Sequence, residues 1–300
     1  MLMLIISLMF NFSFSNEIEI PIENAKIYGT LENPNSEHLI LLISGSGPTD
    51  RNGNSSLLGG DNNSLKYLSD GLNEKGFATF RYDKRMIAKS KGFKGEDSTL
   101  FYDFVSDAIN VVKYIKSNYK FKKLTIIGHS EGALIGGIAS NKLNADNFIS
   151  LCGLSESIDS TVVKQISERA PAVLDEVKSI FDSFNSGKTV DSINPMLYSI
   201  FRPSIQPFII NMLKYNPNNV YKEIKANKLF ISGGHDIQIY SDDVKKLATN
   251  CNAKYIDFPE MNHVLKKTPK AYFDQISSYS DPNLPLYEGL VDSIVKFIEK

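Results

Sequence analysis

Residues 124–139 read LTIIGHSEGALIGGIA, and this stretch decides the fold. Residues 124–127 are apolar and partly β-branched, which is typical of a buried strand. Residues 133–139 are small and apolar and favour a closely packed helix. Between them lies a Gly-x-Ser-x-Gly pattern centred on Ser130. A strand, a sharp turn and a helix in this order present a serine hydroxyl at the end of the strand, where it can act as a nucleophile.

The turn at Ser130 depends on its two glycines, Gly128 and Gly132. A side chain at either position would meet the neighbouring backbone, so glycine is the residue that such a tight turn requires. The helix that follows begins next to the serine, and its first backbone N–H groups point toward any negative charge that forms there. The pattern is weak evidence by itself, but its strand–turn–helix setting makes it specific.

The composition sets limits on the possible functions. The chain has 300 residues, of which 42% are hydrophobic and 22% charged, enough for one large soluble α/β domain with an inserted subdomain. The net charge of −1 and the scattered lysines exclude a general affinity for nucleic acid. With only Cys152 and Cys251, a disulfide scaffold is excluded and no metal-binding spacing is present. Cys152 ends an apolar run and is expected to be a buried core residue.

The N-terminal segment has the features of a signal peptide. Residues 1–10 are almost entirely apolar and are followed by small and polar residues up to Asn16. This run is too short to span a bilayer, so residues 1–15 are predicted to direct export to the periplasm or the medium, with no stable membrane span after processing. No Lys or Arg precedes the run, which keeps a cytoplasmic location as the alternative.

Strand-like and helix-like segments alternate over residues 17–153 and again over 227–300, which predicts a mainly parallel central sheet flanked by helices. Residues 154–226 are mostly helical and predict an inserted helical cap. The first strands, 18–22 and 26–31, are expected to form a hairpin. A long helix is expected over 99–119 with Asp97 or Ser98 as its cap, and a final helix over 286–299.

A serine nucleophile needs a base within hydrogen-bond reach, and that base needs an acid to orient it. In an open α/β sheet these groups project from loops at the carboxyl ends of the strands. Four histidines are available. His38 opens a strand at the opposite edge, His129 adjoins the nucleophile but is expected to point elsewhere, and His235 could touch the site. His263 follows the last predicted strand and is therefore predicted to be the base.

Asp236 is predicted to be the acid because it follows a strand and two glycines at the correct edge. A turn-capping role is its alternative. Glu156, which follows another strand, is the second choice for the acid, whereas Asp257 lies within a strand and is expected to face outward. The oxyanion hole should use the backbone N–H groups of Glu131 and of Ser46, which lies in the loop after the strand at 39–43.

With these residues in place, the chain resembles the α/β-hydrolase superfamily, and within it the bacterial esterases related to serine aminopeptidases and cinnamoyl esterases. The resemblance is carried, in order, by SGSGPTDRNGN at 44–54, RYDKR at 81–85, the turn at 128–132, GGHDIQ at 233–238 and NHV at 262–264. It implies Ser130 as nucleophile, Asp236 as acid, His263 as base, Ser46 as an oxyanion donor and a cap above an acyl pocket. The chain departs from the usual pattern at 85–90, which lack the expected glycines, and at Ser44, where relatives often have histidine.

The expected activity is hydrolysis of a small-molecule carboxylic ester through an acyl-enzyme, without a metal or an organic cofactor. An acyl thioesterase or a serine aminopeptidase would use the same triad, and a non-catalytic binding protein of this fold is the alternative of a different class. The apolar cap segment 204–213 is expected to line the acyl pocket, to pack on the sheet domain, or both. The sequence leaves the oligomeric state open.

Overall fold

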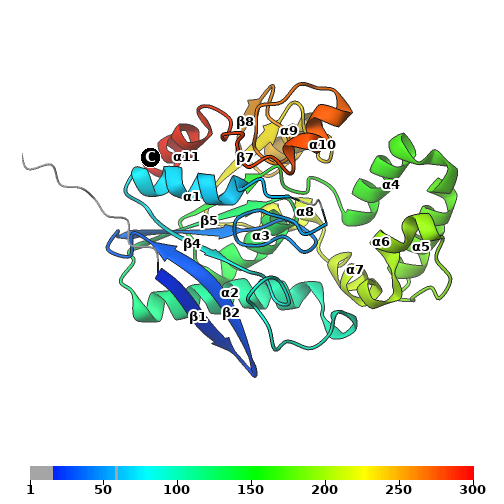
Figure 1. Ribbon diagram of the computed structural model, residues 1–300, viewed down its shortest axis with the longest axis horizontal. Coiled ribbons are helices and arrows are strands. Elements are labelled where there is room, and N and C mark those ends of the chain that lie inside the picture. The colour runs from blue at the N-terminus through cyan, green and yellow to red at the C-terminus, as the bar shows by residue number, and fades with distance from the viewer. Residues whose placement is uncertain (1–15, 58–59) are drawn as a thin grey trace, which may run out of the picture.

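The computed structural model describes residues 16–57 and 60–300. The predicted signal peptide, residues 1–15, lies outside the described residues. The described chain forms an eight-stranded sheet in the order β1-β2-β4-β3-β5-β6-β7-β8, with helices on both faces and a helical lobe at one end (Figure 1). This arrangement confirms the predicted fold class.

The sheet is parallel from β4 through β8 and antiparallel only at its first edge, where β1 and β2 pair with each other and β2 with β4. The predicted hairpin of the first two strands is therefore confirmed. The strands are β1 (Asn16–Ile22), β2 (Ala25–Glu32), β3 (His38–Ile43), β4 (Ala78–Tyr82), β5 (Lys123–His129), β6 (Asn147–Leu151), β7 (Asn227–Gly233) and β8 (Lys254–Phe258).

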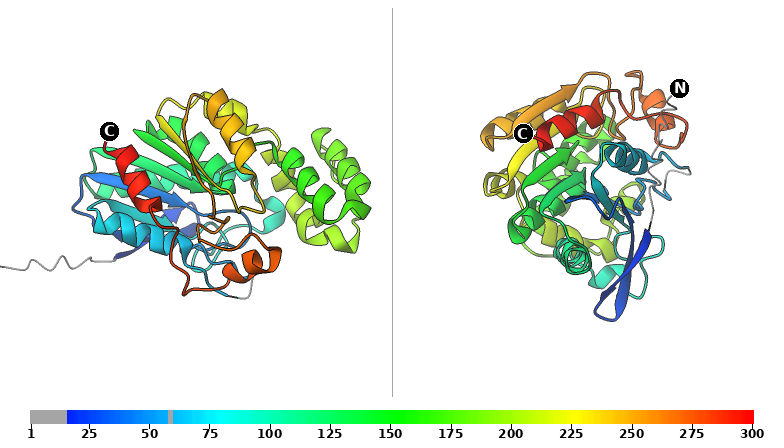
Figure 2. Two further views of the ribbon diagram at one scale, coloured as in Figure 1. Left: turned by 90° about the horizontal axis from the view of Figure 1, so that it is seen from above. Right: turned by 90° about the vertical axis from the view of Figure 1, so that its left-hand side faces the viewer.

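Two layers of helices cover the sheet, as the views in Figure 2 show. The helices α1 (Ser64–Glu74) and α11 (Leu290–Ile298) pack on one face. On the other face lie α2 (Phe101–Asn118), α3 (Glu131–Leu143) and α9 (Ser241–Asn250). Between β8 and α11, the short α10 (Tyr272–Ser278) lies on the surface, where Phe273 is 85% exposed.

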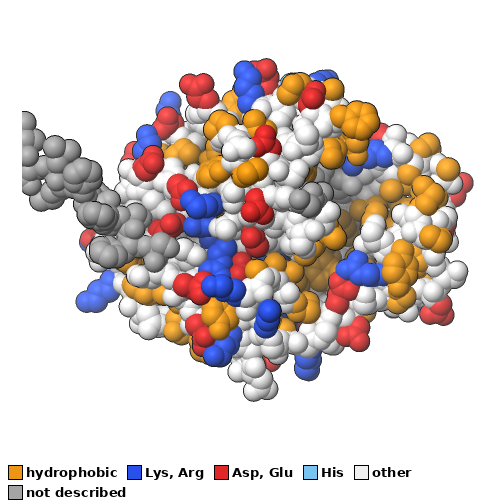
Figure 3. Space-filling model, viewed as in Figure 1, with side chains coloured by type: hydrophobic (Ala, Val, Ile, Leu, Met, Phe, Trp, Pro, Cys, Tyr) orange, Lys and Arg blue, Asp and Glu red, His pale blue; other side chains and the backbone are white. Residues whose placement is uncertain are grey.

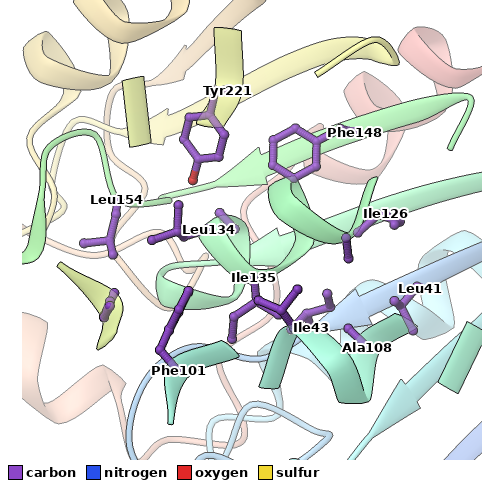
Figure 4. Close-up of a cluster of buried hydrophobic side chains, with 14 of the residues drawn as sticks. Leu41, Ile43, Phe101, Ala108, Ile126, Leu134, Ile135, Phe148, Leu154 and Tyr221 are labelled. Carbon is purple, nitrogen blue, oxygen red and sulfur yellow. The ribbon is translucent and has the colours of Figure 1, made fainter. Parts of the chain in front are cut away.

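The sequence of the strands determines which side chains reach which face. In β3, Leu39, Leu41 and Ile43 join the core under α2 and α3, whereas Ile40 and Leu42 join the core under α1 and α11. This alternation follows from the two-residue period of a strand. A continuous apolar run is needed because both faces are covered. Figure 4 shows part of the first core, in which Ile135 of α3 lies near Phe101 of α2 and Ile43 of β3.

The segment between β6 and β7, in which the cap was predicted, contains the helices α4 (Ile158–Arg169), α5 (Leu174–Asn185), α6 (Tyr198–Phe201), α7 (Gln206–Met212) and α8 (Pro217–Lys222). The first four form the lobe beside the sheet domain in Figure 1, while α8 packs near α3. The lobe contacts the sheet domain through α7, where Phe208 makes edge-to-face contacts with Phe101 and Phe104 of α2. It also does so through α4, where Lys164 forms an ion pair with Asp243 of α9. None of the helices in the described part of the chain has the length and apolar character needed to cross a membrane.

Two local expectations were wrong. The long helix begins at Phe101 with Leu100 as its cap residue, and the carboxylate of Asp103 accepts the Leu100 N–H at 2.8 Å. Residues 96–98, which include the two predicted caps, form a separate 3₁₀ turn. The last helix begins at Leu290, because residues 284–289 form a loop whose backbone meets the segment around Leu265.

Candidate active site

Ser130 lies directly after β5 in a backbone conformation that serine rarely adopts, with φ 54° and ψ −124°. Such strain persists only where the surrounding structure enforces it, and it is common at functional turns. The two glycines of this turn, the nucleophile elbow at residues 128–132, show how the structure enforces this conformation. A Cβ atom on Gly128 would lie 2.2 Å from the Gly132 carbonyl oxygen, and one on Gly132 would lie 2.4 Å from that of Ile43. The strand and helix therefore approach each other too closely for any other residue.

His263 and Asp236 come together from two different loops. His263 lies in the loop after β8 and Asp236 in the loop after β7, and His263 Nδ1 is 2.7 Å from Asp236 Oδ2. Both side chains are buried, with exposed fractions of 5% and 0%. The pair is beside the elbow, because the ring centroids of His263 and His129 are 4.9 Å apart. The structure thus gathers the three residues predicted for the triad at the carboxyl ends of the parallel strands.

Backbone groups hold the Asp236 carboxylate on its other side. Its Oδ1 accepts the N–H groups of Gln238 at 2.7 Å and Ile239 at 3.0 Å. The turn-capping role and the role as partner of the histidine are therefore combined in one carboxylate, each served by a different oxygen. These two N–H donors hold one oxygen in place, so that the other faces the imidazole it orients.

The other residues considered for the triad lie elsewhere. Glu156 is exposed at the start of the cap, near Lys164 and Tyr240. His38 bonds to Thr125 at the amino end of the sheet. The ring of His235 bonds through Nδ1 to the carbonyl of Thr268. Asp257 is exposed, as expected, and accepts hydrogen bonds from serines beside β8.

The loop after β3 lies against the nucleophile. A Cβ atom on Gly45 would be 3.1 Å from the Cβ of Ser130, so the Gly45–Ser46 peptide is next to the serine. Farther along this loop, Arg51 forms an ion pair of 2.8 Å with the buried Asp83, whose other oxygen accepts the Arg51 N–H. This pairing joins the two sequence motifs at 44–54 and 81–85 in the structure.

Cys152 is a buried core residue, as expected, and it also borders the site. It is fully buried but follows β6 with φ +45°, and its thiol lies beside the Asp236 carboxylate. Burial raises the pKa of this thiol, and the nearby carboxylate adds to the effect. The donor atoms of Cys152, Asp236 and His263 lie within 4.8 Å of one another. Both Asp236 oxygens already accept hydrogen bonds, so the cluster fits an imidazole–carboxylate pair better than a metal centre.

Two further buried side chains lie at the site, and the sequence reasoning gave neither of them a role there. The first is His129, which was expected to point elsewhere but whose Nε2 lies 2.7 Å from the His263 carbonyl oxygen. The second is Lys84, whose ammonium donates to the Gly45 carbonyl. The position of Lys84 just after a buried strand was the available signal, because such a residue must lie at the carboxyl edge of the sheet.

Comparisons with known proteins find similar chains among esterases and a serine aminopeptidase family. Residues 59–152 match the model of the serine aminopeptidase family S33. Among curated proteins, the chain is similar to the esterase EstD of Thermotoga maritima, with 23% identity over 254 residues. That alignment covers 78% of this chain but 57% of the relative, so the chain spans little more than half of the relative's length.

Solved structures share the fold at low sequence identity. An esterase from Pyrococcus furiosus superposes with a TM-score of 0.64 and 16% identity, covering 96% of this chain and 91% of that one. Est1E from Butyrivibrio proteoclasticus, solved with ferulic acid bound, gives a TM-score of 0.62 and 16% identity, covering 94% and 100%. The shared strand order and these superpositions show that the chain has the α/β-hydrolase fold.

Proposed function

We propose that this protein hydrolyses carboxylic esters through an acyl-enzyme formed on Ser130. The observation that carries the proposal is the 2.7 Å contact between His263 Nδ1 and Asp236 Oδ2 beside a strained serine elbow. A serine hydroxyl is a poor nucleophile at neutral pH unless a base removes its proton. The similarity to esterase EstD supports an ester as the substrate class.

In the proposed mechanism, Asp236 accepts the Nδ1 proton of His263 and leaves Nε2 free to act as the base. As the Ser130 oxygen attacks the ester carbonyl, its proton moves to Nε2. The tetrahedral intermediate then collapses, the C–O bond to the alcohol breaks, and His263 returns the proton to the leaving alkoxide. Water, activated by the same imidazole, cleaves the acyl-enzyme and restores Ser130.

Two backbone N–H groups would stabilise the negative charge on the tetrahedral oxygen. Glu131 is the first residue of α3, so its N–H has no partner within the helix. Ser46 provides the second N–H, from a peptide that lies against Ser130. Donors held rigidly at such positions stabilise the transition state more than the substrate.

A serine aminopeptidase is the second candidate, favoured by the family model that matches residues 59–152. That activity needs a carboxylate to bind the ammonium group of the substrate. Two cap carboxylates accept hydrogen bonds from neighbouring residues, and two others, Asp175 and Asp182, are exposed. Glu176 accepts hydrogen bonds from Asn194, Glu168 accepts one from Tyr240, and Asp175 is fully exposed beside Lys178. These contacts favour the esterase.

The test is a panel of p-nitrophenyl esters of increasing chain length, acyl-CoA thioesters and aminoacyl anilides. The wild-type protein is expected to prefer the esters. Ser130→Ala should lower kcat by about 10⁴- to 10⁶-fold without unfolding the protein. The matched control is Ser140→Ala on α3, whose buried hydroxyl donates to the Gly136 carbonyl and should be dispensable for turnover. Turnover of anilides alone, or an active Ser130→Ala variant, would refute the proposal.

A further inference from the structure

Lys84 is a buried lysine at the carboxyl ends of the parallel strands, where the candidate site lies. It follows β4 by two residues and is only 2% exposed. Its ammonium donates to the carbonyl of Gly45 and lies 3.9 Å from a carboxylate oxygen of Glu131. The ring centroid of Phe104 is 5.6 Å from the same nitrogen. Burying a lysine is costly, so its partners should explain why it is there.

The first partner fixes one oxyanion donor. The carbonyl of Gly45 and the N–H of Ser46 belong to the same peptide unit, which is planar and trans, so the two groups point in opposite directions. A hydrogen bond to the carbonyl from Lys84 therefore determines where the N–H points. Because the donor is charged, it also polarises the peptide and strengthens the N–H as a donor.

The second partner belongs to the other oxyanion donor. Glu131 supplies its backbone N–H at the start of α3, and its side chain turns back toward Lys84. Burial lowers the pKa of Lys84 and raises that of Glu131, while their mutual attraction opposes both shifts. The two charges thus depend on each other, and one ammonium touches both residues that carry the donors.

We propose that Lys84 is a positioning residue of the oxyanion hole, which aligns the Ser46 N–H through the Gly45 carbonyl and anchors Glu131 through its carboxylate. This inference rests on the proposed function. It assigns no contact between Lys84 and the substrate, because the ammonium lies behind the peptide that would hold the oxyanion.

A positioning role makes a specific kinetic prediction. An oxyanion hole acts on the transition state, so its misalignment should lower kcat and leave KM nearly unchanged. Lys84→Met is expected to lower kcat on a p-nitrophenyl ester by about 10- to 100-fold, with KM within about twofold. A trifluoromethyl ketone, whose adduct with Ser130 places an oxyanion in the hole, should bind more weakly by the same factor.

The controls separate this role from a contribution to folding alone. Lys84→Arg retains a charged donor and should recover part of kcat, and Glu131→Gln should lose less than Lys84→Met because its backbone N–H remains. Lys228→Met is the matched control. Lys228 lies at the amino end of β7, away from the site, and its ammonium also donates to a backbone carbonyl, that of Tyr221. This variant should leave kcat unchanged. Urea titrations of all variants report the folded fraction. If Lys84→Met does not fold, the steady-state kinetics and the ketone affinity are measured on Lys84→Gln, which also removes the charge but keeps a polar side chain.

The outcomes of this experiment are distinguishable. A proportional loss of kcat and of ketone affinity, with KM unchanged and partial recovery in Lys84→Arg, supports the inference. An active wild type together with a folded Lys84 variant of equal kcat overturns the inference alone, and so does a loss confined to stability. A wild-type protein that turns over no ester and does not react with a fluorophosphonate contradicts the proposed function, and the inference fails with it.

Discussion

The imidazole of His129 donates from Nε2 to the backbone carbonyl of His263, across 2.7 Å. Since a carbonyl only accepts, the proton must be on Nε2, which fixes the tautomer of this ring. Burial lowers the pKa of His129 to about 3, so the ring is neutral near pH 7. This bond ties the elbow after β5 to the loop after β8, and it thereby couples the nucleophile to the base.

The contribution of this bond can be measured with His129→Phe, which keeps an aromatic ring but removes the donor. The His263 carbonyl would lose its partner, so the free energy of unfolding should fall by about 1–3 kcal/mol. The released loop should also misplace the base and lower kcat by about 10- to 100-fold, with little change in KM. Steady-state kinetics and urea titration measure the two effects. His129→Gln, which retains an N–H donor, should recover part of both.

The identity of the acid is tested by comparing Asp236→Asn with Glu156→Gln. Asp236→Asn keeps the shape of the side chain but loses the charge that orients His263, so kcat should fall by about 10³- to 10⁴-fold. Glu156 is exposed, and His263 Nδ1 is already bonded to Asp236, so Glu156→Gln should stay within about twofold of wild type. A larger loss of kcat in Glu156→Gln than in Asp236→Asn would identify Glu156 as the acid instead.

The sequence was sufficient for the central part of the fold because local signals there agree with one another. Apolar runs, glycine-rich turns and helical periodicity alternate from β3 to β6, and each indicates the same parallel sheet. The wrong helix cap at Asp97 or Ser98 shows the limit. There the tertiary contact of Glu96 with Arg202 and Ser204 of the cap lobe favours a separate turn over a continuous helix.

Within the site, position along the chain indicated Ser130, Asp236 and His263, because each follows a strand at one edge of the sheet. The same reasoning places Lys84 at that end of the sheet, but it identifies no partner for the lysine or for the thiol of Cys152. These side chains acquire their roles only from neighbours that are distant in sequence, such as Gly45 for the lysine and Asp236 for the thiol. The apolar segment 204–213 also depends on distant neighbours. Its Phe208 packs on α2, as expected for a segment that packs on the sheet domain.

A final prediction concerns acid stability and His38, which lies at the amino end of the sheet. Burial lowers the pKa of His38 to about 4, and the nearby Lys123 adds to the effect while Asp146 opposes it. The side chain bonds to Thr125 at 2.8 Å and packs edge-on against Phe77. The unfolded chain, with an ordinary histidine pKa near 6.5, binds this proton more readily than the folded one.

The sign of the pH effect follows from this difference. The stability that His38 contributes is fully present above about pH 6.5 and is lost as the pH falls toward 4. Solvent screens this partly exposed site, so between pH 7 and pH 5 the wild-type protein should lose about 1 kcal/mol more unfolding free energy than His38→Gln, as measured by urea titration at both values. Some acid sensitivity should persist in the variant because the pKa of His129 is lowered in the same direction. As a control, kcat at pH 7 should be the same in both proteins because His38 is remote from Ser130. Equal losses of unfolding free energy in the two proteins would contradict the prediction, because they would mean that His38 is protonated in the folded chain without penalty.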